Sequence, residues 1–244
     1  MLIFSRPKKI TVDFITYDYK SYDYFPIDRS NKFIPQWWKD IPQEYCSDTF
    51  QTKANRINTL KRCPGFMDVF RYSYTMPLWT SCEIIVDDRV NDQGYSTSCA
   101  DGSEVTSHDS SQGGNFLTSN SLIHFKFNSP WRGYSTKKRD LLWDWAPATW
   151  NNPALLNKLM IPTAFRNFRG GTGTNIHSFM DSSKRDVLYL EAGVPMIHMT
   201  PMTDKKVEVN CHYDPDWYSK VSQCLSMNFS NNSVYYTRRK NMKI

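Results

Sequence analysis

The sequence predicts a mainly β fold with a few short helices, arranged as an antiparallel β-sandwich or a jelly-roll-like barrel. Three observations indicate this class. Several segments alternate apolar and polar residues, the pattern of strands with one buried face. The 13 prolines interrupt the apolar stretches and keep any helix short. Aromatic residues make up 15% of the chain, which is enough large apolar surface to build a substantial core.

Length and composition indicate one domain. The 244 residues suit a single large β domain, and we find no repeat or heptad pattern that would divide them. We therefore expect one β-rich domain over residues 1–244. Residues 95–115 are dominated by Ser, Thr, Asp and Gly, and we expect them to form an exposed loop or insertion.

The first half of the chain is expected to supply two strands and two short helices. Residues 8–17 alternate in polarity, and residues 82–88 are rich in β-branched side chains, so both are predicted strands. In FIPQWWKDIPQ a proline precedes a helically spaced apolar run and another ends it, which predicts a short helix. A second short helix is predicted over residues 64–70. The rings expected to be largely buried are Trp37 or Trp38, together with Phe66, Phe70 and Trp79.

The second half is expected to continue the β pattern. Residues 122–130 alternate and end at a proline, and the glycine-rich residues 169–174 read as a turn between two β elements. A helix is predicted over residues 151–160, and another begins at Asp214, whose carboxylate can cap it. Further strands are predicted over residues 187–190, 194–199 and 205–214.

The six cysteines are widely spaced and contain no Cys-x-x-Cys pair, so we interpret them as free thiols. The N-terminal residues place their charges after a very short apolar run, which is unlike a secretory signal peptide. No apolar run approaches the roughly 18–20 residues that a membrane-spanning helix needs. We therefore expect neither secretion by a signal peptide nor a transmembrane segment, and no membrane partner.

Histidines are the only residues that invite a metal-site interpretation. The single His-x-Asp motif begins at His212 and has no histidine after it, which is the wrong order for a non-haem iron oxygenase. A cupin-type site would gather histidines on adjacent strands, and His124, His177 and His198 with a nearby carboxylate are the candidates for it. The competing interpretation is that these histidines are simply packed or hydrogen-bonded.

Other catalytic or binding motifs are absent or incomplete. The glycines of residues 169–174 lack the Gly-Lys-Ser/Thr ending of a phosphate-binding loop, and no Gly-x-Ser-x-Gly motif is present. We assign no catalytic residue and no cofactor. The basic tail is a candidate nucleic-acid contact, although such runs are more often solvated. Its residues are Arg238, Arg239 and Lys240.

The order of three blocks resembles a known group of proteins. The blocks are FIPQWWKDIPQ, TLKRCPGFMDVFRYSYTMPLW and LEAGVPMIHMTPMTDKKVEV, and the group is a family of uncharacterised proteins of tailed bacteriophages, especially marine T4-like phages. It is similar to a domain-of-unknown-function class with a late strand, Gly-x-Pro, strand unit, here residues 193–195. The resemblance implies a phage origin, and no functional residue can be carried over from it.

Two functions follow as hypotheses. The first is a non-enzymatic virion or assembly component, such as a head, neck or tail accessory protein, which contacts other virion proteins or a second copy. Its interface would include Trp37 and Trp38. The alternative is a cupin-like metal-dependent enzyme that acts in the infected host cell. These hypotheses place the protein in the virion or in the host cytoplasm.

Overall fold

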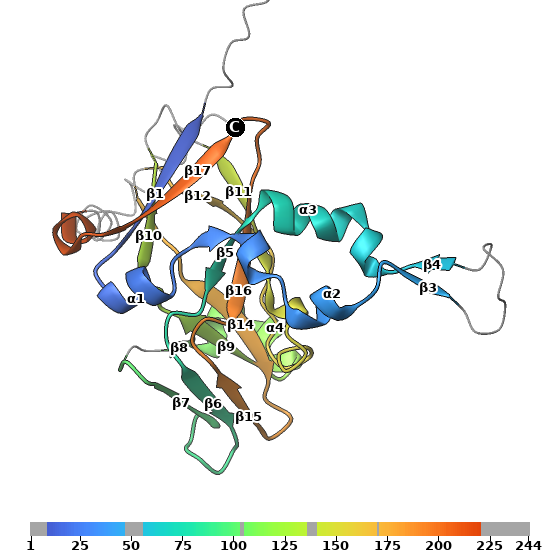
Figure 1. The fold of residues 1–244 in the computed structure, drawn as a ribbon. Helices are drawn as coiled ribbons and strands as arrows, with labels where there is room; N and C mark the ends of the chain where they lie inside the picture. Colours follow the sequence, from blue (N-terminus) through green and yellow to red (C-terminus); the bar gives the residue numbers. More distant parts are fainter. Residues whose placement is uncertain (1–8, 47–55, 103–104, 136–140, 170, 221–244) are drawn as a thin grey trace, which may run out of the picture.

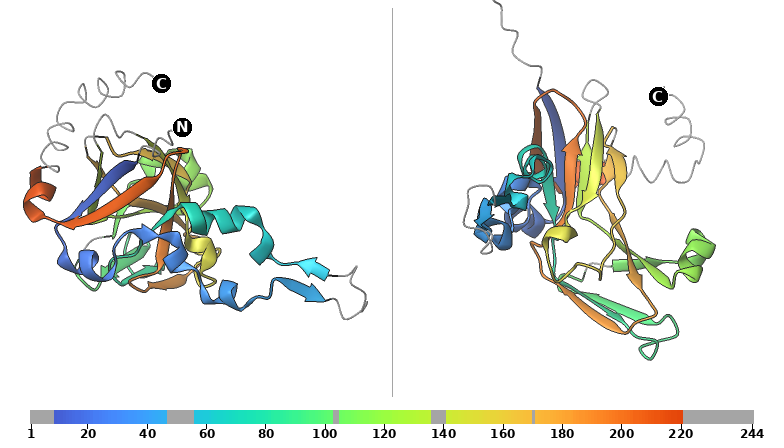
Figure 2. Two further views of the ribbon diagram at one scale, coloured as in Figure 1. Left: turned by 45° about the horizontal axis from the view of Figure 1, so that its top comes forward. Right: turned by 90° about the vertical axis from the view of Figure 1, so that its right-hand side faces the viewer.

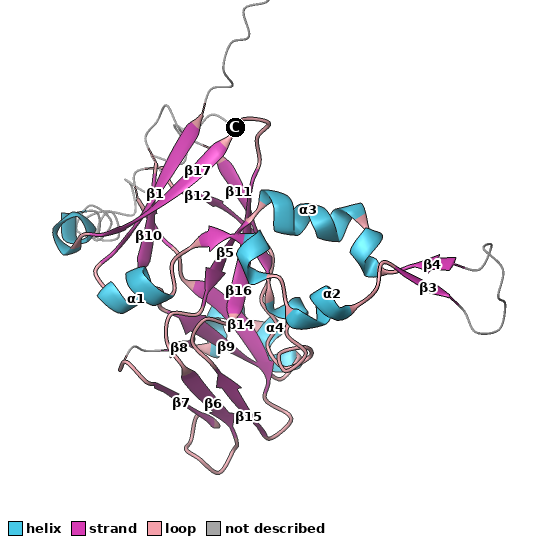
Figure 3. Ribbon diagram, in the orientation of Figure 1, coloured by secondary structure: helices cyan, strands magenta, loops and turns pink. Residues whose placement is uncertain are grey.

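The computed structural model describes residues 9–46, 56–102, 105–135, 141–169 and 171–220. The fold is mainly β, as predicted (Figure 3). The helices and 3₁₀ turns are α1 (Tyr19–Tyr24), η1 (Ser30–Phe33), α2 (Gln36–Asp40), η3 (Leu60–Arg62), α3 (Pro64–Tyr72), η4 (Ser110–Gly113), α4 (Asn115–Ser119) and η6 (Thr149–Asn151). The strands are β1 (Ile10–Thr16), β2 (Asp28–Arg29), β3 (Glu44–Cys46), β4 (Arg56–Asn58), β5 (Tyr74–Pro77), β6 (Cys82–Val86), β7 (Tyr95–Cys99), β8 (Val105–His108), β9 (Leu122–Phe127), β10 (Trp131–Tyr134), β11 (Leu142–Pro147), β12 (Ala164–Asn167), β13 (Thr172–Gly173), β14 (Ile176–Asp181), β15 (Asp186–Leu190), β16 (Pro195–Pro201) and β17 (Val207–Tyr213).

The sheets form a sandwich-like arrangement of two layers (Figure 1). One layer joins the sheet β13-β10-β1-β17 to the sheet β14-β9-β8, and the other joins β12-β11-β16-β5-β2 to β15-β6-β7. Within each layer the chain passes directly from one sheet to the other. Residues 128–130 join β9 to β10 in the first layer, and residues 78–81 join β5 to β6 in the second. Neighbouring strands are antiparallel except β1 and β17, which are parallel. Among the described strands no barrel closes, so the sandwich alternative of the prediction is the one that holds.

Aromatic side chains fill the space between the layers. Phe14 on β1 and Trp143 on β11 both pack against the fully buried Phe168, with ring centroids 5.0 Å and 5.8 Å away. Toward the other end of the sandwich, Tyr95 on β7 meets Phe125 on β9 at 5.2 Å. These residues and their apolar neighbours form one continuous cluster, which supports a single core.

The helices α1, α2 and α3 lie on one side of the sandwich, and α4 lies on the other (Figure 2). Pro64 occupies the first turn of α3, where its missing N–H is not needed, and α3 turns Phe70 inward. Residues 215–220 are also helical, and the Asp214 carboxylate accepts from the backbone N–H of Trp217 as predicted. None of the helices in the described ranges is long and apolar enough to cross a membrane.

The tryptophan-rich block packs into the interior as predicted. One of its two predicted interface residues, Trp38, is buried. Trp38, Phe70 and Trp79 are buried, and Phe66 is half-buried. Trp38 packs against Phe66 and Phe70 at 5.7 Å and 5.4 Å, so its ring is not available to a partner and the interface assignment of Trp38 is wrong. Trp37 is half-buried and donates its Nε1–H to the backbone carbonyl of Asn151 at 2.8 Å.

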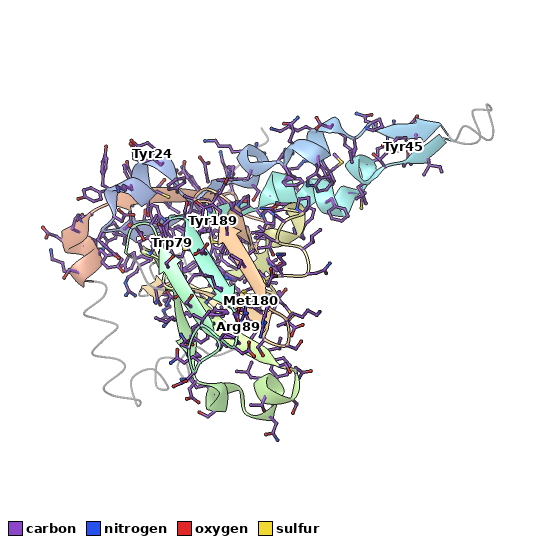
Figure 4. All side chains as sticks on the ribbon, turned by 90° about the horizontal axis from the view of Figure 1, so that it is seen from below. Tyr24, Tyr45, Trp79, Arg89, Met180 and Tyr189 are labelled. Atoms are coloured by element: carbon purple, nitrogen blue, oxygen red, sulfur yellow. The ribbon has the colours of Figure 1, made fainter. Side chains whose placement is uncertain are left out.

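The hairpin of β3 and β4 projects from the body (Figure 4). Its two strands pair only with each other in the part of the chain that the structure describes. Tyr45 and Ile57 stand directly opposite one another across this pair, and both are exposed. The hairpin therefore carries apolar side chains away from the core.

Two predicted elements are wrong. Residues 95–115 are not a loop, because β7 and β8 lie within them and pair with β6 and β9. Their Ser and Thr side chains do not alternate with apolar residues, so these strands can be recognised only through their pairing with β6 and β9. Residues 151–160 do not form a helix, because Asn152 Oδ1 accepts from the Ala154 N–H in a local turn and Asn157 adopts a φ of 65°.

Candidate metal centre

Three histidines lie on three neighbouring strands at the outer face of the sheet β14-β9-β8. Successive side chains of a strand point to opposite faces of the sheet, and this alternation places the histidines on the outer face. Phe125 and Phe127 on β9 are buried in the core, so the intervening His124 and Lys126 point to the opposite face. Buried residues alternate along β14 in the same way, which turns His177 outward. His108 ends β8 directly opposite His124.

The three imidazoles converge. Their ligand atoms all lie within 4.8 Å of one another. The rings of His108 and His124 stack with centroids 4.5 Å apart, and His124 Nε2 lies 2.9 Å from His177 Nδ1. One of these two nitrogens therefore carries a proton and donates it to the other. A metal ion between them would replace this proton, which would move to the other nitrogen of the same ring.

A glutamine fixes the orientation of His108. Asp109 opens η4 by accepting from the Ser111 N–H, and this turn brings Gln112 back toward His108. Gln112 Oε1 lies 2.6 Å from His108 Nδ1, so Nδ1 donates and carries the proton. His108 Nε2 is then deprotonated; it is buried and has no hydrogen-bond partner among the described residues. Metal-ligating histidines are usually held by such a bond to the second nitrogen.

The surroundings favour the neutral form of His124 and His177. Burial lowers the pKa of His177 to about 4, and the positive charges of its neighbours, including Arg166 and Lys126, add to the effect. Burial also lowers the pKa of His124, with contributions from His108 and Lys126. A neutral imidazole is the form that binds a metal ion, so at neutral pH these ligands do not have to lose a proton from a charged state.

The donor set determines which metals fit. Imidazole nitrogen suits zinc, copper, nickel and cobalt, whereas the iron oxygenase triad also needs a carboxylate. No carboxylate belongs to the cluster within the described ranges. A tetrahedral zinc ion with Zn–N bonds of about 2.0–2.1 Å holds its nitrogens about 3.3 Å apart. The closest pair, at 2.9 Å, would open by only about 0.4 Å to accommodate it.

The structure brings together two of the three predicted histidines. His124 and His177 meet as the cupin-type hypothesis requires, but His108 takes the third position. His198 does not join them, because it is buried on β16 between the rings of Phe70 and Trp150. His108 was missed because its segment reads as a loop. The usable signal is that His124 and His177 occupy the outward positions of strands whose other face is apolar.

His212, which begins the single His-x-Asp motif, lies outside the cluster. His212 Nε2 pairs with Asp13 Oδ1 at 3.1 Å on the parallel strands β17 and β1. Arg238, Arg239 and Lys240 fall outside the described residues, so the nucleic-acid contact stays a prediction.

Comparison of the chain with protein-family models, with curated proteins and with solved structures gave no match. The resemblance to phage proteins therefore stays a prediction. Any functional assignment rests on the residues themselves.

Proposed function

We propose that the protein binds one divalent transition-metal ion, best zinc, through His108, His124 and His177, and uses the open coordination position in a metal-dependent reaction. The observation that supports this proposal is the convergence of three imidazoles from three strands within 4.8 Å, with one buried nitrogen that has no partner among the described residues. A buried acceptor without a partner is costly, and a metal ion would satisfy it.

Three protein ligands and an open fourth position are typical of catalytic rather than structural zinc sites. Zinc at such a position lowers the pKa of a bound water and polarises a carbonyl or phosphoryl oxygen. The three histidines are half-buried, so part of each residue faces solvent at this outer sheet face. The metal ion would therefore act as a Lewis acid on an outer sheet face. This agrees with the metal-dependent enzyme that the sequence offered as an alternative.

Isothermal titration of the purified, chelator-treated protein with zinc tests the proposal. We expect one equivalent to bind, and the His177→Ala variant to bind at least tenfold more weakly. His212→Ala is the matched control, because His212 is a surface histidine outside the cluster, and it should bind zinc like the wild type. Equal zinc affinity in the wild type and His177→Ala would refute the site.

A second candidate is a virion or assembly component, and the projecting hairpin favours it. An isolated two-stranded hairpin is marginally stable in water, and the paired side chains of Tyr45 and Ile57 are 55% and 62% exposed. Packing of this hairpin against a neighbouring subunit would bury both. The resemblance to phage proteins agrees with this role.

Sedimentation of the purified protein tests the second candidate. We expect an oligomer that the double variant Tyr45→Ser, Ile57→Ser converts to smaller species, whereas Tyr24→Ser does not. Tyr24 is a fair control because it is 69% exposed and lies on α1, away from the hairpin (Figure 4). A monomeric wild type, together with absence from purified particles by mass spectrometry, would remove this candidate.

A further inference from the structure

Lys126 lies on the same outer face as the three histidines. It follows His124 by two residues on β9, and residues two apart on a strand share a face. It also stands directly opposite His177 on β14 and Thr106 on β8. Residues opposite one another on antiparallel strands have Cβ atoms about 4.5–5.5 Å apart. The ammonium group of Lys126 is therefore a neighbour of the proposed metal position.

This ammonium has no acidic partner within the residues that the structure describes. Among the described residues, no ion pair or hydrogen bond involves the Lys126 side chain. Two described carboxylates near the histidines in sequence bond elsewhere: Asp109 caps η4 and Asp181 accepts from Ser183 in the turn after β14. Neutral imidazoles, a divalent ion and Lys126 would leave a net positive site.

A hydrogen-bond donor, Thr106, and an apolar wall formed by the rings of Phe179 and Phe116 lie beside the histidines on this face. Thr106 Oγ1 accepts from the Asn128 amide at 3.3 Å, which leaves its own hydroxyl proton free to donate. On the other side of His124, the ring of Phe179 lies 4.9 Å away and meets Phe116 at 6.1 Å. Phe179 is half-buried and Phe116 is exposed, so both rings can contact a ligand.

We infer that the open metal position takes a small organic carboxylate with an apolar substituent. One carboxylate oxygen would bind the metal, the other would accept from Lys126 and Thr106, and the substituent would pack on Phe179 and Phe116. A carboxylate neutralises much of the excess positive charge, and the charge-assisted hydrogen bond to an ammonium is among the stronger ones in proteins. This inference rests on the proposed metal site and specifies its ligand class.

The test uses the full-length protein loaded with cobalt, whose visible spectrum changes when the open position changes ligand. We expect benzoate to bind more tightly than acetate, and acetate to bind more tightly than inorganic phosphate. The Lys126→Met variant should bind benzoate about tenfold or more weakly and cobalt at least as tightly as the wild type, and Lys126→Arg should retain most of the benzoate binding. Lys32→Met is the control, because Lys32 pairs with Asp28 on another element.

The outcomes separate the two proposals. Failure to bind cobalt would overturn both the metal site and the carboxylate inference. Cobalt binding with no spectral response to benzoate, or with an unchanged response in Lys126→Met, would overturn the inference alone. Tighter binding of phosphate than of benzoate would also contradict it, because the apolar wall would then contribute nothing. Cobalt binding by Lys126→Met at wild-type affinity or tighter would show that this variant is folded at the site.

Discussion

At the scale of single residues, the histidines show how surroundings give one side chain different roles. His108, His124 and His177 gather one ring nitrogen each within 4.8 Å on an outer face. His198 is 2% exposed, and its Nδ1 lies 3.1 Å from Thr75 Oγ1 in a buried group of hydroxyls. His212 is partly exposed and pairs with a carboxylate. Only the first environment gathers the ligands of a metal ion.

The buried imidazole of His198 is expected to make the free energy of unfolding depend on pH. Burial lowers its pKa to about 4, so the unfolded imidazole takes up a proton between about pH 6.5 and pH 4 that the folded one does not. Stability is therefore fully present above about pH 6.5 and is lost as the pH falls toward 4. The loss from this residue is of order 3 kcal/mol.

Urea unfolding at a series of pH values measures this effect. We expect the free energy of unfolding of the wild type to fall over this range, and the His198→Asn variant to show a shallower decrease. Some decrease should remain, because the pKa of His177 is lowered in the same direction. An identical pH dependence in His198→Asn and the wild type would contradict the assignment.

Gly133 on β10 is required by close packing. A Cβ at this position would lie 2.3 Å from Cδ1 of Phe168, which is fully buried and cannot move aside. We expect Gly133→Ala to lower the free energy of unfolding by about 1–3 kcal/mol. Gly65→Ala on α3 is the control, since a Cβ there meets nothing within 4 Å and alanine favours a helix. Equal stability of the two variants would show that the contact is not strained.

At the scale of elements, the strands that alternate in polarity could be predicted and those that do not could not. β1, β9 and β17 follow an apolar-polar pattern, and the predictions for them are confirmed. β7 reads YSTSC and is recognisable only through its partner β6. The missing prediction of β8 affected the site more than that of β7, because His108 lies on β8. The metal hypothesis therefore named His198 as the third histidine.

The pairing of β6 and β7 predicts a redox response. Cys82 and Cys99 stand directly opposite one another, with sulfur atoms 2.9 Å apart. We expect glutathione disulfide to oxidise the two thiols to an internal disulfide, with release of two glutathione thiols, detectable by non-reducing peptide mapping. Closing a loop of about 15 residues should stabilise the protein by up to about 3 kcal/mol.

The control for this reaction is Cys63→Ser, which should leave the crosslink and the gain in stability intact, because Cys63 lies on another element. Cys99→Ser should abolish both. Failure of the wild type to form a Cys82–Cys99 disulfide under conditions that oxidise a model dithiol would contradict the expected geometry.

At the scale of the whole molecule, one two-layer core carries two separate features. The outer face of β14-β9-β8 holds the histidines, and the β3-β4 hairpin projects from a different part of the chain (Figure 1). The sequence was sufficient to predict the fold class, because apolar-polar alternation and prolines can be read within each segment without knowledge of its neighbours in space. It was not sufficient for the site, because strand register alone decides that His108 faces His124. The proposed metal site and the proposed assembly contact can therefore be tested independently.

The most direct measurement of the central claim is X-ray absorption of the zinc-loaded protein, which reports the atoms bound to the metal. We predict three imidazole nitrogens at about 2.0–2.1 Å with one further light atom, and loss of one imidazole contribution in His108→Ala. A sulfur ligand at about 2.3 Å would place the metal at the cysteines, and a shell of oxygen atoms without imidazole would indicate surface binding. Either result would contradict the proposal.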